Sequence, residues 1–111
     1  MTRITTHVLD TSAGHPAGGV SVKLEMQSGN GWKEIATGTT DQDGRVTNLA
    51  DGKDHPGGTY RLRFGVGDYF AARQITAFYP VVEVTFTVTH GEHYHVSLLL
   101  SPFGYSIYRG S

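Results

Sequence analysis

The sequence predicts an all-β sandwich, and two observations support this fold class. Apolar residues recur at every second position in several short stretches, which is typical of strands that bury one face. The clearest stretch is 82–89, Val-Glu-Val-Thr-Phe-Thr-Val-Thr, where apolar and polar side chains alternate without a break. Many of the 15 glycines lie in turn-forming clusters between such stretches, as expected of a chain that reverses direction often.

The pattern predicts about eight short strands joined by tight turns. Strand 4–9 is rich in β-branched residues, and strand 20–26 alternates apolar with polar side chains. The next two strands each follow a sequence in which Gly, Asn or Asp permits a tight bend. In chain order, the expected strands are 4–9, 20–26, 32–38, 45–49, 60–66, 82–89, 94–101 and 104–109.

One segment, 68–74, departs from the period of two. Its sequence, Asp-Tyr-Phe-Ala-Ala-Arg-Gln, begins with a good N-cap residue and continues with helix formers. A short surface helix is therefore expected there. The chain contains no internal repeat, and its length suits a single core, so we expect residues 1–111 to form one domain.

The composition excludes several classes of protein. The formal net charge is −1 and acids and bases are interspersed, which argues against nucleic-acid tracking and against a polybasic membrane anchor. The chain has no cysteine, so disulfides, thiolate zinc sites and thiol nucleophiles are impossible. No segment approaches the ~18 apolar residues of a membrane span, and the N-terminus lacks the apolar core of a signal peptide. We expect a soluble, cytoplasmic protein whose partner is a small molecule or a protein.

Histidine, arginine and hydroxyl groups must carry any chemistry. His93 and His95 point to the same face of a strand, as two metal ligands or two ordinary surface residues would. A zinc site would need a third ligand, from His90 or a distant carboxylate. His7 faces away from Val8 on the outer side of its strand.

The outer faces of two strands carry apolar residues that a monomer would expose. Leu9 accompanies His7, and Leu99 accompanies His95, which indicates a surface covered by another subunit. Arg45 leaves a turn, where arginines are commonly solvated. Together with neutral imidazoles, however, a guanidinium that holds an oxyanion suits metal-free hydrolysis.

Several blocks together resemble the 5-hydroxyisourate hydrolases, the transthyretin-related family of purine catabolism. They occur in family order and cover almost the whole chain. The terminal tetrapeptide distinguishes these hydrolases from hormone-carrying transthyretin. The blocks are Thr6-His7-Val8-Leu9-Asp10-Thr11, residues 40–45, Phe78-Tyr79-Pro80, His93-Tyr94-His95-Val96, residues 98–102 and Tyr108-Arg109-Gly110-Ser111.

The resemblance implies a prealbumin-like sandwich of two four-stranded sheets with one short helix. It also implies a homotetramer, a dimer of dimers, with sites at the dimer–dimer interface. In those sites His7 and His95 would orient and deprotonate water, and Arg45 would bind substrate and stabilise the oxyanion. Tyr108 and Ser111 would shape the pocket.

The implied reaction is attack of water on a ring carbonyl of 5-hydroxyisourate, giving 2-oxo-4-hydroxy-4-carboxy-5-ureidoimidazoline. It needs no metal and no other cofactor. Two positions depart from the family pattern, since Ser97 stands where proline is common and Ile107 where threonine is common. The resemblance assigns no clear role to His93 or Arg109.

Three alternatives to this reading stay open. A transthyretin-like protein would bind a small molecule in the same channel without turnover. A metal-dependent hydrolase would use His90, His93 and His95. A purely structural sandwich would tolerate loss of the terminal tetrapeptide.

Overall fold

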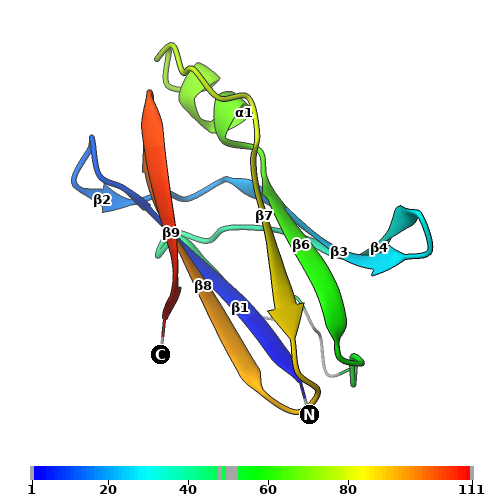
Figure 1. The fold of residues 1–111 in the computed structure, drawn as a ribbon. Helices are drawn as coiled ribbons and strands as arrows, with labels where there is room; N and C mark the ends of the chain where they lie inside the picture. Colours follow the sequence, from blue (N-terminus) through cyan, green and yellow to red (C-terminus); the bar gives the residue numbers. More distant parts are fainter. Residues whose placement is uncertain (1, 48, 50–52, 111) are drawn as a thin grey trace.

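Two β-sheets face each other across an apolar core, and a short helix lies at one end of the sandwich (Figure 1). The structure is a computed structural model that describes residues 2–47, 49 and 53–110. The described residues contain no helix long and apolar enough to cross a membrane. In chain order the elements are β1 (Arg3–Asp10), β2 (His15–Pro16), β3 (Ser21–Ser28), β4 (Gly31–Thr39), β5 (Arg45–Val46), β6 (Gly58–Phe64), α1 (Val66–Ala71), β7 (Val82–Val88), β8 (His93–Ser101) and β9 (Gly104–Gly110).

The strand order of the two sheets confirms the predicted all-β sandwich. One sheet has the order β4-β3-β6-β7, and all its pairings are antiparallel. The other has five strands, where the family resemblance implied four: its order is β2-β1-β8-β9, with the short β5 also paired to β1. In this second sheet β1 and β8 run parallel, while β9 returns antiparallel to β8. Strands from both ends of the chain therefore form the middle of one sheet.

Two very short strands, β2 and β5, pair with β1. The periodicity did not predict β2, and it predicted a longer strand at the position of β5. His15 and Pro16 of β2 pair with the end of β1, but a two-residue strand is too short to show an alternating pattern. The strand expected at 45–49 is limited to Arg45–Val46 of β5. Asn48, within the expected range, lies outside the described residues.

Alternate residues of both sheets fill the core, as the period of two predicts. Ile4 and Val8 of β1 point inward and are at most 1% exposed. Because these even-numbered residues point inward, the odd-numbered residues of β1 lie on the outer face. The largest fully buried side chains include Ile4, Val8, Val22, Leu24, Tyr60, Leu62, Phe64, Phe70, Leu98 and Leu100.

The helix begins earlier than the sequence pattern predicted. It was expected at 68–74, whereas α1 begins at Val66 and ends at Ala71. Val66, Tyr69 and Phe70 are buried, and this spacing of i, i+3 and i+4 places all three on one helix face. Burial of that face against the core decides where the helix lies.

Asp68 is not the N-cap residue, so that part of the prediction is wrong. Gly65 occupies the N-cap position without a side-chain cap, and Asp68 lies in the first turn, where a carboxylate still interacts favourably with the helix dipole. The alternating pattern predicted a strand over 60–66, whereas β6 ends at Phe64. The strand ends before Gly65, which is already the N-cap residue of α1. The backbone N–H of Gly65 donates a hydrogen bond to the Ser21 carbonyl.

A buried carboxylate joins α1 to β1. Asp10 is 1% exposed, and its Oδ2 accepts a hydrogen bond of 2.7 Å from the Tyr69 hydroxyl. Its Oδ1 accepts from the backbone N–H and hydroxyl of Ser12 and from the backbone N–H of Ala13. Burial raises the pKa of Asp10, but these hydrogen bonds outweigh it and the pKa is lowered overall. Burial and the neighbouring carboxylate raise the pKa of Tyr69 to about 12.

We expect Asp10→Asn to lower the free energy of unfolding by about 1–3 kcal/mol at pH 7, because charge-assisted hydrogen bonds are lost. The folded-state pKa of Asp10 lies below its unfolded value. The stabilisation is therefore complete above the unfolded pKa of about 3.9 and is lost as the pH falls through the lowered folded value. Urea unfolding at one protein concentration, from neutral pH to about pH 3, measures this change.

Asp68→Asn is the control, since Asp68 is an exposed carboxylate on the same helix. It should change the unfolding free energy far less than Asp10→Asn does. A difference between wild type and Asp10→Asn that stays constant down to pH 3 would contradict the role assigned to the carboxylate.

Candidate active site

Three residues predicted for the site lie together on the outer face of the β2-β1-β8-β9 sheet. His7 of β1 pairs in register with Arg45 of β5 on one side and with Ser97 of β8 on the other. His95 lies on the same face of β8, opposite Thr5 of β1. The ring centroids of His7 and His95 are 6.4 Å apart, with planes inclined by 36°. The parallel pairing of β1 with β8 thus brings both imidazoles and one guanidinium to one surface.

The last strand adds a phenol to this surface. Tyr108 of β9 pairs in register with Ser97, and its side chain is 53% exposed. Gly110 pairs with His95, and a Cβ at position 110 would lie 2.8 Å from Cδ2 of the His95 ring. Only glycine therefore allows β9 to lie this close to the imidazole. Ser111, also predicted for the site, lies outside the described residues.

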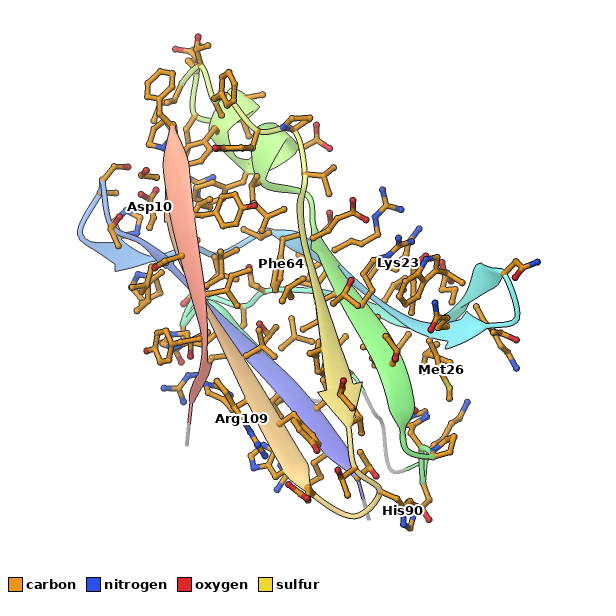
Figure 2. The ribbon with its side chains drawn as sticks, viewed as in Figure 1. Asp10, Lys23, Met26, Phe64, His90 and Arg109 are labelled. Atoms are coloured by element: carbon orange, nitrogen blue, oxygen red, sulfur yellow. The ribbon has the colours of Figure 1, made fainter. Side chains whose placement is uncertain are left out.

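Arg109 does not join this group, because its side chain leaves β9 toward the opposite face. Its guanidinium carbon lies 4.3 Å from the centroid of the Tyr94 ring. One of its nitrogens donates to the backbone carbonyl of His93 at 3.1 Å and approaches Glu92 Oε1 at 3.4 Å. Figure 2 shows Arg109 close to the end of β9. Arg109 therefore holds β9 against β8 and Tyr94.

Ile107, one of the two departures from the family pattern, also lies on this inner side. It pairs with Leu98 and packs, partly buried, against the core. The departure from threonine therefore changes the core beneath the site.

Thr5 is a member of the site that sequence reasoning missed. Its hydroxyl lies 2.8 Å from Nδ1 of His95 and 3.1 Å from Nε2 of His93. Thr5 is only 8% exposed, so its hydroxyl depends on these two imidazoles for partners. Its position two residues before His7, on the same face of one strand, was the signal that could have found it.

Burial and positive charge lower the pKa of His95. Desolvation is the largest cause, and the charges of His7, His93 and Arg45 add to it. A neutral imidazole keeps one unprotonated ring nitrogen at pH 7, and this nitrogen can accept a proton. His95 is therefore the side chain of this face best prepared to act as a base.

His90 does not complete a three-histidine set with His93 and His95. It lies beyond β7 at the end of the sandwich away from α1 (Figure 2), and its Nε2 is 2.9 Å from the Asp54 carboxylate. Within residues 2–47, 49 and 53–110, no three histidine, aspartate or glutamate side chains are grouped to hold a metal ion. The zinc arrangement considered from the sequence is thus not formed by His90.

Comparison with known proteins shows the family to which the chain belongs. The model of the HIUase/Transthyretin family matches residues 4–110. The chain belongs to this family. The 5-hydroxyisourate hydrolase of Salmonella dublin is 47% identical over 109 residues, which are 97% of this chain and 80% of that protein.

Two solved structures from the HIUase/Transthyretin family share the fold. The 5-hydroxyisourate hydrolase of Klebsiella pneumoniae has a TM-score of 0.88 at 32% identity, covering 98% of this chain and 99% of that one. Sea bream transthyretin in complex with thyroxine has a TM-score of 0.91 at 38% identity, covering 97% and 94%. The transthyretin-like sandwich is confirmed. Because both proteins share it, side chains rather than fold must separate the family's activities.

We expect NMR titration of the intact protein to give a midpoint for His95 below 6.5, the ordinary histidine value. Arg45→Gln should raise this midpoint, because it removes one of the positive charges that disfavour the imidazolium. Arg73→Gln is the matched control, since Arg73 stacks on Tyr69 near α1 and should leave His95 unchanged. A midpoint at or above 6.5 in the wild type would contradict this electrostatic account.

Proposed function

We infer that this protein is a hydrolase that converts 5-hydroxyisourate to 2-oxo-4-hydroxy-4-carboxy-5-ureidoimidazoline in urate degradation. The observation that carries this inference is the grouping of His95, whose pKa is lowered by burial, with His7, whose ring lies 6.4 Å away, and with Arg45 paired beside His7. The hydrolase relatives with nearly full-length similarity support it.

We propose that His95 removes a proton from water while the water oxygen attacks a ring carbonyl of the substrate. His7 orients this water, because the separation of the two rings leaves room for one small group within hydrogen-bond reach of both. Arg45 binds the substrate and stabilises the negative charge that develops on the carbonyl oxygen. When the cyclic C–N bond breaks, the proton passes from His95 to the leaving nitrogen. Tyr108 and Ser111 shape the pocket.

The proposed mechanism is metal-independent and uses no cofactor. General-base catalysis typically supplies about 10²- to 10⁴-fold, and a donor placed at the oxyanion adds on the order of 10²- to 10³-fold. Because these two effects come from imidazole and guanidinium groups, neither step requires a Lewis acid.

We further propose that residues 1–111 act as one domain and assemble as a homotetramer with sites at the dimer–dimer interface. The outer face that carries His7 also carries the half-buried Leu9 and Leu99, and a second subunit on this face would cover them. Such a subunit would also enclose a substrate held by Arg45 and Tyr108. A cytoplasmic location remains a prediction from the sequence, and the cysteine-free composition is compatible with a reducing compartment.

A second candidate function is small-molecule binding without turnover. The similarity to a transthyretin solved with thyroxine supports it. In that case the imidazoles and Arg45 would contribute to affinity alone.

We expect the wild-type chain to accelerate the decay of freshly generated 5-hydroxyisourate, followed by ultraviolet absorbance, and a chelator to leave the rate unchanged. His95→Gln should lower kcat by about 10²- to 10⁴-fold through loss of the base. Deleting residues 108–111 should abolish most of the acceleration, because the deletion removes Tyr108 and the strand segment against His95.

His15→Gln is the control for these measurements, since His15 is an exposed histidine of β2 far along the sheet from His95. It should retain wild-type activity. No acceleration by folded wild-type protein would reject the hydrolase and favour the binding protein. Loss of activity with chelator would reject metal independence alone.

We expect light scattering coupled to size-exclusion chromatography to give a mass four times the 12.0 kDa of one chain. Leu99→Glu should reduce this mass, because a charge on the outer face would be buried between subunits. An exposed site on the other sheet, Thr37→Glu, is the control and should remain tetrameric. A wild-type mass of one chain would contradict the proposed assembly.

A further inference from the structure

One hydroxyl lies between two imidazoles at the centre of the site. Thr5 Oγ1 is 2.8 Å from Nδ1 of His95 and 3.1 Å from Nε2 of His93. The two imidazole centroids are 6.5 Å apart, so the rings interact through the hydroxyl. The backbone register of β1 and β8 holds Thr5 directly opposite His95. Gly110 of β9 pairs with His95 on the other side of β8, and a side chain at position 110 would collide with Cδ2 of the His95 ring.

The hydroxyl can donate only one hydrogen bond, although it can accept two. If it donates to one imidazole nitrogen, the other nitrogen must carry a proton and donate to Oγ1. If both nitrogens donated, the hydroxyl proton of this buried residue would have no acceptor among the described residues, at a cost in free energy. His95 Nδ1 therefore carries a proton when His93 Nε2 does not, and it lacks a proton when His93 Nε2 carries one.

We propose that Thr5 is a positioning residue that sets the tautomer of His95 according to the protonation of His93. This inference deepens the proposed hydrolase function and rests on it for its catalytic consequence.

In the active arrangement, His93 Nε2 is unprotonated and accepts from the Thr5 hydroxyl. Thr5 Oγ1 accepts from Nδ1–H of His95, and the lone pair of His95 lies on Nε2, where it can take a proton from water. When His93 is protonated, its Nε2–H donates to Thr5 and the hydroxyl donates to His95 Nδ1. The proton of neutral His95 then lies on Nε2, so that nitrogen can no longer act as the base.

The charged groups around His93 and His95 are mainly positive. Arg3 faces His93 across the β1–β8 register, and His7 and Arg45 face His95 from β1 and β5. From β9, Tyr108 lies opposite Ser97, and Arg109 donates to the His93 carbonyl. The neighbouring carboxylate, Glu92, approaches Arg109 at 3.4 Å. Protonation of His93 thus adds a charge to a region already rich in cations.

The test is ¹⁵N NMR of the histidine side chains in the intact, substrate-free protein, because the shifts of Nδ1 and Nε2 report which nitrogen is protonated. As the pH is lowered through the range in which imidazoles ordinarily gain a proton, the wild type should convert His95 from the Nδ1–H to the Nε2–H form. Thr5→Ser keeps the hydroxyl and should show the same conversion. Thr5→Val should remove the dependence of the His95 tautomer on His93.

Thr6→Val is the matched control, because it is the same substitution at the next residue of β1. The Thr6 hydroxyl points to the core side and donates to the Val96 carbonyl, so its loss should leave the tautomer of His95 unchanged. His93→Phe provides a second route at an exposed position. It should abolish the pH-dependent conversion even where Thr5→Val does not fold.

In hydrolysis assays, Thr5→Val should lower kcat by about 10- to 100-fold with a smaller change in KM, part of the general-base contribution. Thr5→Ser should restore kcat to within about 3-fold of the wild-type value. It should also restore the wild-type decrease of kcat at acidic pH. An identical pH course of the His95 tautomer in wild type and in folded Thr5→Val or His93→Phe would overturn the proposal. The NMR result is independent of turnover, so an inactive wild type would reject only the hydrolase function.

Discussion

The parallel pairing of β1 with β8 is the constraint on which the rest of the site depends. It joins residues that are 90 positions apart in the chain, as in the contact of Thr5 with His95. A parallel pair needs a long crossover connection, and here that connection includes the whole opposite sheet. The two imidazoles are therefore neighbours only because the chain between them forms the opposite sheet.

The core keeps this pairing in register. Residues at alternate positions of β1 and β8, such as Val8 and Leu98, are completely buried, while His7 and His95 lie between such positions on the outer face. A slip of one residue would exchange the two faces and bury the histidines. The Asp10–Tyr69 hydrogen bond adds a second restraint where β1 ends. Packing on one side of the sheet thus determines geometry on the other.

The HIUase/Transthyretin family illustrates how little the fold itself specifies. The same sandwich is found in a hydrolase and in a transthyretin that was solved with thyroxine. On one face of the sheet this chain carries an imidazole whose pKa is lowered by burial, a second imidazole paired with a guanidinium, and a threonine hydroxyl within hydrogen-bond distance of the first imidazole. These properties arise from neighbours across strands, which explains why a few substitutions on one face can change the chemistry of the fold.

Local pattern in the sequence was sufficient for the fold class and for the face on which each strand residue lies. The period of two assigned His7 and His95 to outer faces, and the resemblance to known hydrolases named Arg45 and Tyr108. Both the period of two and the family motifs consist of residues that are close together along the chain.

Only the tertiary structure decided which distant residues become neighbours. In the structure the helix begins at Val66, the Arg109 guanidinium stacks on Tyr94, and the Thr5 hydroxyl lies between two imidazoles. The physical reason is that register, ring contacts and hydrogen-bond partners across a sheet depend on pairing between segments far apart in sequence. Periodicity specifies the face of a residue, whereas packing specifies its partner.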